Sequence, residues 1–147
     1  AILHKEGALT GQEFAQMKLH VSRGLAITDH SAWLRLARDV IAGHHERFDG
    51  SGYPQGLAGE AIPLTARLFA IADVFDALSS RRPYKEAFAL ERSLELMQQE
   101  AGSHFDPSLL AAFVAIAPAL HARVRSLDRE GLENELKTAI PRYWDLV

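Results

Sequence analysis

Apolar residues recur every three or four positions along most of the chain, and no stretch alternates apolar and polar residues as a strand does. This period places the apolar side chains on one face of a helix and predicts an all-α fold. We expect helices to begin near residues 10, 31, 63, 90 and 106, with one more amphipathic helix after residue 118. The predicted buried stripes of the first three are Phe14, Met17, Val21 and Leu25; Trp33, Leu34, Ala37, Val40 and Ile41; and Leu64, Leu68, Ile71, Phe75 and Leu78.

Residues suited to helix ends support these boundaries. Thr10 and Glu13 have the Thr-x-x-Glu spacing of a capping box, which should start the first helix. Pro118 should break or kink the fifth helix, because proline lacks the backbone N–H. The other predicted caps and stops are Ser31, Gly102 and Asp106–Pro107.

The third predicted helix is apolar or small on nearly every side, which is typical of a central helix. Opposite its leucines, Ala66, Ala70, Asp73 and Ala77 form a strip that another helix can approach closely. We therefore expect Asp73 to be buried. A buried carboxylate must be paired, hydrogen-bonded or bound to a metal, so the alternatives are a metal ligand and a structural salt bridge.

Three histidines lie on or near the expected apolar faces. His20 lies at the edge of the first stripe, and His44 and His45 close the second helix. At about 100° per residue, adjacent histidines on a helix diverge, so each would hold one of two neighbouring metals, or one would bind substrate. The alternative is a polar helix terminus favoured by the helix dipole. The glycine-rich loop over residues 46–63 is either functional or a plain connector.

Composition narrows the chemistry. With 147 residues, 48% of them hydrophobic, the chain can build one real core. A net charge of −3 argues against binding to polymeric nucleic acid. The absence of cysteine limits metal ligands to imidazole and carboxylate groups and fits a reducing cytoplasm. No apolar run reaches the roughly 18–20 residues of a membrane span, so no membrane segment is expected.

A basic cluster of Arg81, Arg82 and Lys85 follows the third helix. It suits either phosphate binding or favourable placement at a helix C-terminus. Together, His20, His44, His45, Asp73 and this cluster suit a two-metal site for phosphodiester hydrolysis.

Residues 44–54 read His-His-Glu-x-x-Asp-Gly-x-Gly-Tyr-Pro and resemble the signature of the HD-GYP family, a subgroup of the HD metal-dependent phosphohydrolases. The resemblance extends over about residues 2–117. The flanking segments that carry it are Leu9–His20, Leu57–Leu64, Ala72–Leu78, Arg82–Lys85 and Gly102–Pro107.

The resemblance implies an HD-superfamily bundle of about five to seven helices over residues 1–117. It does not cover residues 118–147, which the apolar pattern predicts to be a helical extension. It implies a bacterial, cytoplasmic signalling hydrolase that converts cyclic di-GMP to pGpG or GMP with two or three divalent ions, Fe or Mn. A homodimer and contacts of the GYP loop with GGDEF domains are further expected partners. The implied roles are metal binding by His20, His44, His45 and Asp73, catalysis by Asp73 and His45, and substrate binding by Arg82, Lys85, Gly52, Tyr53 and Pro54.

One departure concerns the His-Asp pair after which the family is named. No His-Asp dipeptide occurs in the chain, and Asp29-His30 has the reverse order. The family places this pair, whose aspartate bridges the metals, ahead of the segment where the chain begins. Two interpretations follow: the chain is a truncated piece of an active enzyme, or it is a degenerate module that binds cyclic di-GMP or a GGDEF partner without turnover.

Overall fold

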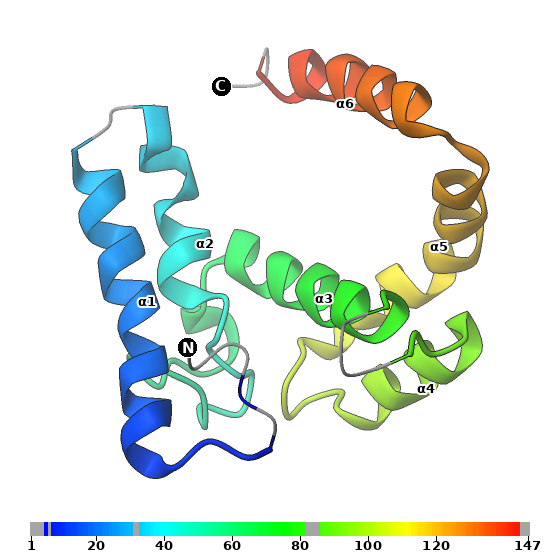
Figure 1. Cartoon of the computed structure of the whole chain (residues 1–147). Coiled ribbons are helices and arrows are strands. Elements are labelled where there is room, and N and C mark those ends of the chain that lie inside the picture. Colours follow the sequence, from blue (N-terminus) through cyan, green and yellow to red (C-terminus); the bar gives the residue numbers. More distant parts are fainter. Residues whose placement is uncertain (1–4, 6, 31–32, 82–85, 145–147) are drawn as a thin grey trace. The chain divides into compact units, whose positions relative to one another are not determined.

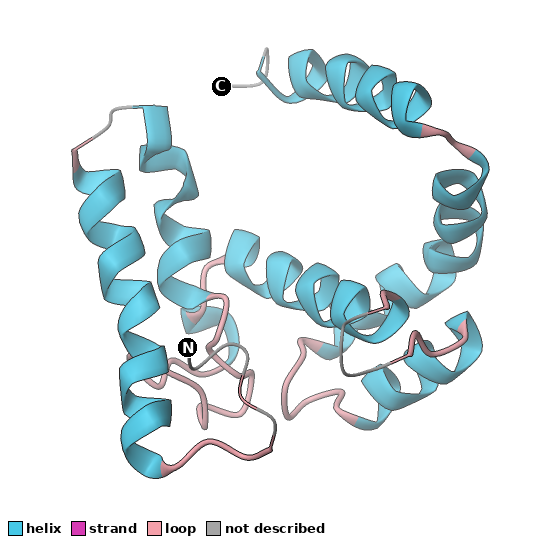
Figure 2. Ribbon diagram, viewed as in Figure 1, coloured by secondary structure: helices cyan, strands magenta, loops and turns pink. Residues whose placement is uncertain are grey.

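The computed structural model describes residue 5 and residues 7–30, 33–81 and 86–144. These residues form six α-helices and no β-strand, which confirms the all-α prediction (Figure 2). The chain divides into two compact units, Ala1–Ala112 and Phe113–Val147. Each unit is described by itself.

The first helix, α1, runs from Gly11 to Asp29. Thr10 accepts a hydrogen bond from the backbone N–H of Glu13, whose carboxylate accepts one from the N–H of Thr10, so the predicted capping box is present. The helix continues through Thr28 and ends at Asp29. Thr28 is buried and donates its hydroxyl to the carbonyl of Leu25, which allows this polar residue to stay inside the helix.

The second predicted helix consists of a 3₁₀ turn, Trp33–Ala37, followed by α2, Arg38–Gly43. The predicted cap Ser31 lies outside the described residues. In Figure 1 α2 runs beside α1. Gly43 is buried at the end of α2, where an added Cβ would lie only 2.9 Å from the Cβ of Ala66. The absence of a side chain at Gly43 therefore lets α2 approach the third helix.

That third helix, α3, spans Leu64–Ser79 and packs on α2 through its alanines. Ala66, Ala70 and Ile71 are buried, as expected for the alanine strip and for one member of the leucine stripe. Leu64 and Leu68, however, are about half exposed, so the prediction that they are buried is wrong. The close approach of Gly43 selects the small residues of α3 as the contact face.

Helix α4, Leu90–Gln99, buries Leu94 and Met97 and is followed by Gly102 in the left-handed region. Helix α5 begins at Pro107 and extends into the second unit. Asp106 caps it by accepting hydrogen bonds from the N–H groups of Ser108 and Leu109. The carboxylate of Asp106 also forms a largely buried ion pair with Arg67 of α3, with a 2.6 Å N–O distance.

In the second unit α5 continues to Ser126, and α6 covers Arg129–Trp144. Helix α5 carries Pro118 in its interior without interruption, so the predicted break there is wrong, whereas the predicted kink stays a prediction. The α5 and α6 helices are joined by an ion pair between Arg123 and Glu135. The later helix confirms the helix predicted after residue 118.

Helix α5 is the one described helix whose length and composition would suffice to cross a membrane. Its most apolar 18-residue window has a mean hydropathy of 1.5, a feature that the search for uninterrupted apolar runs did not reveal. Core helices of proteins outside membranes meet the same criterion. Length and composition alone therefore do not assign α5 to a membrane.

Candidate metal centre

Three imidazole rings converge where α1 meets the end of α2. The Nε2 atom of His20 lies 3.4 Å from Nε2 of His44 and 3.1 Å from Nε2 of His45. One ligand atom from each ring lies within 4.8 Å of the others. The three predicted histidine ligands are thus brought together from residues 24 positions apart in the sequence.

Backbone carbonyls indicate the tautomer of two of these rings. The Nδ1 atom of His20 lies 2.8 Å from the carbonyl oxygen of Met17, and Nδ1 of His44 lies 3.0 Å from that of Val40. A carbonyl only accepts, so we assign the proton of each neutral ring to Nδ1. The Nε2 lone pairs of His20 and His44 then face each other without a hydrogen between them.

This arrangement fits a divalent cation. Two lone pairs 3.4 Å apart repel each other, and a cation bound between them would remove the repulsion. Two nitrogens each at about 2.1 Å from one ion would stand about 3.0–3.4 Å apart, the spacing these rings already have. Imidazole donors suit Fe, Mn and Zn, and a hydrogen bond from the opposite ring nitrogen to a carbonyl is the usual outer support of such ligands.

The prediction that the side chains of His44 and His45 diverge is wrong. Helix α2 ends at Gly43, so both histidines lie in the turn that follows it and the 100° step of a helix does not separate them. Their ring centroids are 4.1 Å apart, and both rings face His20. The two side chains can therefore serve one ion together with His20.

His45 is kept neutral by its surroundings. Burial, followed by the neighbouring His44, His20 and His104, lowers the pKa of His45 from 6.5 to about 4. A neutral imidazole is the form that binds a metal. His45 therefore needs to lose no proton to become a ligand at neutral pH.

Glu46 organises the loop that follows the histidines. Its side chain is only 2% exposed, and its two carboxylate oxygens accept the backbone N–H groups of Gln55 at 2.7 Å and Leu57 at 3.1 Å. The backbone of Gly52 lies so close to the backbone of Glu46 and Arg47 that an added Cβ would lie 2.3 Å from the nitrogen of Arg47. The loop is thereby folded back onto the histidine segment, and the N–H of Tyr53 donates to the carbonyl of His45.

The ring of Tyr53 joins the metal centre to α1. It stacks on His45 with ring centroids 4.7 Å apart and meets the edge of Phe14 at 5.9 Å. The ammonium nitrogen of Lys18 lies 4.7 Å from the centroid of Phe14 and 4.8 Å from that of Tyr53. The predicted substrate-binding Tyr53 is thus adjacent to the histidine cluster.

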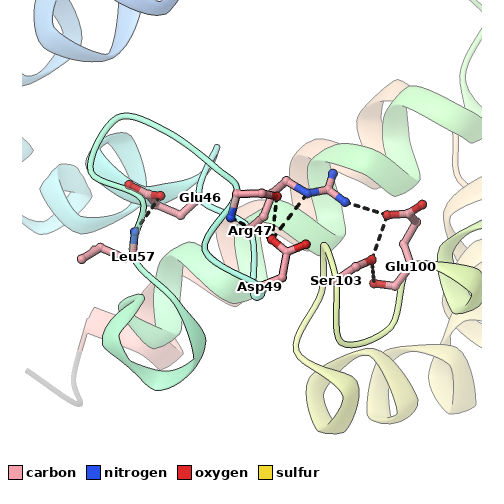
Figure 3. Close-up of polar contacts among 7 residues, drawn as sticks. Glu46, Arg47, Asp49, Leu57, Glu100 and Ser103 are labelled. Carbon is pink, nitrogen blue, oxygen red and sulfur yellow. Dashed lines mark hydrogen bonds and ion pairs between the residues drawn. The ribbon is translucent and has the colours of Figure 1, made fainter.

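Arg47 and its partners fasten the same loop to the segment before α5 (Figure 3). Its guanidinium donates to Glu100 at 2.7 Å and lies 4.0 Å from Asp49. Two backbone hydrogen bonds add to this contact, from Phe48 N–H to the His104 carbonyl and from Asp49 N–H to the Ser103 carbonyl. The start of the loop is therefore fixed to the segment before α5.

His104 and Glu46 were not singled out by sequence reasoning. Burial, and next Arg47, lower the pKa of His104, while Glu100, Asp49 and Asp73 act in the opposite direction. His104 also contributes to the lowered pKa of His45, so it lies within electrostatic reach of the centre. The Gly-x-His-Phe-Asp-Pro turn was the available signal for His104, and the glutamate after the histidine pair was the signal for Glu46.

Asp73 is exposed, so the expectation of a buried carboxylate is wrong. Gly43 meets the first half of α3 at Ala66, and Asp73 lies farther along the helix, past this closest approach. Asp73 is not part of the histidine cluster among the described residues, although it acts on the charge of His104. The predicted phosphate-binding residues Arg82 and Lys85 lie outside the described residues.

Comparisons with known proteins identify the family of this chain. Residues 1–109 match the HD domain family. The chain is 45% identical over 123 residues to a cyclic di-GMP phosphodiesterase of Vibrio cholerae, covering 79% of this chain and 25% of that protein. It is 45% identical over 112 residues to the 3′3′-cGAMP-specific phosphodiesterase 2 of the same organism, covering 75% of this chain and 22% of the relative.

A solved structure is also similar. The crystal structure of a cyclic GMP-AMP specific phosphodiesterase of V. cholerae superposes with a TM-score of 0.55 at 28% identity, over 74% of this chain and 25% of that one. The chain therefore belongs to the HD domain family, and its relatives support the HD-GYP assignment. It spans about a quarter of the length of the curated relatives that it matches.

Proposed function

We propose that this chain forms the metal-binding and substrate-binding part of a phosphodiesterase that hydrolyses cyclic di-GMP to pGpG or GMP. The observation that carries the proposal is the convergence of His20, His44 and His45 beside the folded GYP loop. The names of the relatives at about 45% identity support the substrate class.

In this proposal the three histidines hold divalent cations through Nε2, supported by the carbonyls behind His20 and His44. Two or three Fe or Mn ions, when bound, would polarise the phosphodiester and favour attack by water. We assign Asp73 as a further metal ligand beside the three histidines. We also assign Asp73 and His45 as the catalytic residues. Asp73 acts to raise the pKa of His104, which supports a place for Asp73 near the site.

The remaining predicted residues bind the substrate. Arg82 and Lys85 would hold the phosphate by a bidentate fork and a point charge, respectively. Gly52, Tyr53 and Pro54 would line the site, because Glu46 folds their loop onto the histidine segment. Orientation of the diester by these groups would supply much of the rate enhancement.

The test is hydrolysis of cyclic di-GMP by the full-length protein, which includes this chain, with Mn or Fe(II). We expect pGpG or GMP to form with the wild type and with His30→Ala, an exposed histidine in the turn after α1. We expect no product from His44→Ala. Wild-type binding of cyclic di-GMP without turnover would favour the non-catalytic module, and the absence of both binding and turnover would refute the proposal.

A second substrate class has specific support. A 3′3′-cGAMP-specific relative is as similar in sequence as the cyclic di-GMP enzymes, and the solved neighbour is cyclic GMP-AMP specific. The alternative function is hydrolysis of 3′3′-cGAMP at the same centre. Comparison of kcat/KM for the two dinucleotides decides between them, because the higher value identifies the preferred substrate.

Broader assignments complete the proposal. We assign residues 1–117 to the HD-GYP-like domain and residues 118–147 to a helical extension. The GYP loop is the proposed contact for GGDEF domains, and a homodimer in the cytoplasm is the proposed assembly and location. Co-elution with a GGDEF domain, abolished by a Tyr53→Ala substitution, would support the partner. Light scattering tests the dimer.

A further inference from the structure

Lys18 is a cation held beside the metal centre by aromatic rings. Its side chain is half-buried, and its ammonium lies within 5 Å of the ring centroids of both Phe14 and Tyr53. The spacing of Phe14 and Lys18, four residues apart, puts them on the same helical face. Their arrangement against Tyr53 orients the ammonium toward the GYP loop.

The charge of Lys18 is available to a ligand. None of the carboxylates among the described residues forms an ion pair with it, whereas Lys5, which precedes α1, pairs with Glu13 at 2.6 Å. Aromatic faces attract an ammonium but do not accept the directed hydrogen bonds that its three N–H groups can donate. An oxyanion is the chemical group that meets both the charge and these donors.

The position of Lys18 relative to the histidines indicates which oxyanion could bind its ammonium. Lys18 contacts Tyr53, and Tyr53 in turn stacks on His45, so one aromatic ring separates the ammonium from the metal-ligating imidazoles. A phosphodiester held by the metal centre would therefore stand apart from the ammonium. A cyclic dinucleotide carries a second phosphodiester on the far side of its ring, and this group is the one free to reach Lys18.

We propose that Lys18 binds the second, non-reacting phosphodiester of the cyclic dinucleotide and thereby selects cyclic substrates over ligands that carry one phosphate. This inference rests on the proposed function and adds a residue that the histidine signature does not include. Lys18 would hold the substrate in the ground state and the transition state alike. Its loss should then weaken binding without altering the chemical step.

The experiment compares two ligands by calorimetry on the Mn-loaded full chain. Cyclic di-GMP carries two phosphodiesters, whereas the linear dinucleotide GpG has both guanines and one phosphodiester. Lys18→Met keeps an unbranched apolar side chain against Phe14 and Tyr53 and removes the charge. Lys18→Arg keeps the charge, and Lys137→Met removes an exposed lysine of α6 as a matched control.

We expect Lys18→Met to weaken cyclic di-GMP binding about tenfold or more, the loss expected for one charge-assisted hydrogen bond. GpG binding, manganese content and the melting temperature should stay close to wild type, and Lys18→Arg should restore most of the affinity. Equal weakening for both ligands, or no weakening for either, would overturn the inference and leave the proposed function standing. A wild-type chain that binds no cyclic dinucleotide would overturn both.

Discussion

Glu46 is the residue whose removal tests most directly how the loop is held beside the three histidines. It is 2% exposed, and its carboxylate accepts two backbone N–H groups, at 2.7 and 3.1 Å. Among the described residues no cation pairs with it. Each hydrogen bond to a charged group contributes about 1.5–3 kcal/mol, so a Glu46→Ala substitution forfeits about 3–6 kcal/mol.

Part of that loss is offset, because the substitution also removes the cost of burying a carboxylate. The net destabilisation should be about 2–4 kcal/mol, since a small cavity adds to the lost hydrogen bonds. Glu46→Gln should cost about half as much, because its amide oxygen still accepts one N–H while the NH₂ group faces the other.

Two measurements check this. Urea unfolding followed by circular dichroism reports the change in free energy of unfolding, with Glu95→Ala on the exposed face of α4 as the control. Amide hydrogen exchange reports the loop itself, since Gln55 and Leu57 should lose protection in Glu46→Ala. A cost under about 0.5 kcal/mol, the range of ordinary surface changes, with protection of both amides intact, would refute the reasoning.

Three further outcomes are expected. His20→Ala should weaken Mn²⁺ binding more than about tenfold while leaving the helix content unchanged, as measured by calorimetry and circular dichroism. In the metal-free chain, NMR should show His45 titrating near pH 4. Its pKa should rise in His20→Ala, and its contribution to stability should be present above pH 6.5 and be lost as the pH falls toward 4. A His45 that titrates at 6.5 contradicts this reading. Gly52→Ala should destabilise by about 1–3 kcal/mol or more in urea unfolding, whereas Gly11→Ala, with open space around it, should not.

The helices were predictable because their signals are local. The Thr10 capping box, the stop at Gly102 and the Asp106 cap act over four residues or fewer, so the pattern of neighbours sufficed to place them. The prediction of a helix break at Pro118 was wrong. The loss of one backbone hydrogen bond at a proline does not end a helix whose neighbouring turns are formed. The prediction of the buried face of α3 was wrong in part, because that face is set by the contact of Gly43 with Ala66, which joins two different helices.

The sequence by itself determined the family and the identity of the three histidines, since His44, His45 and the GYP loop form one continuous signature and His20 lies on a recognisable flank. Only the tertiary structure decided how they meet. The end of α2 at Gly43 turns both histidines toward His20, which a helical wheel does not show. The contacts of Lys18 with Tyr53 and of Glu46 with its loop likewise depend on the packing of separate segments, because side-chain directions beyond a helix end are set by tertiary contacts and not by local period.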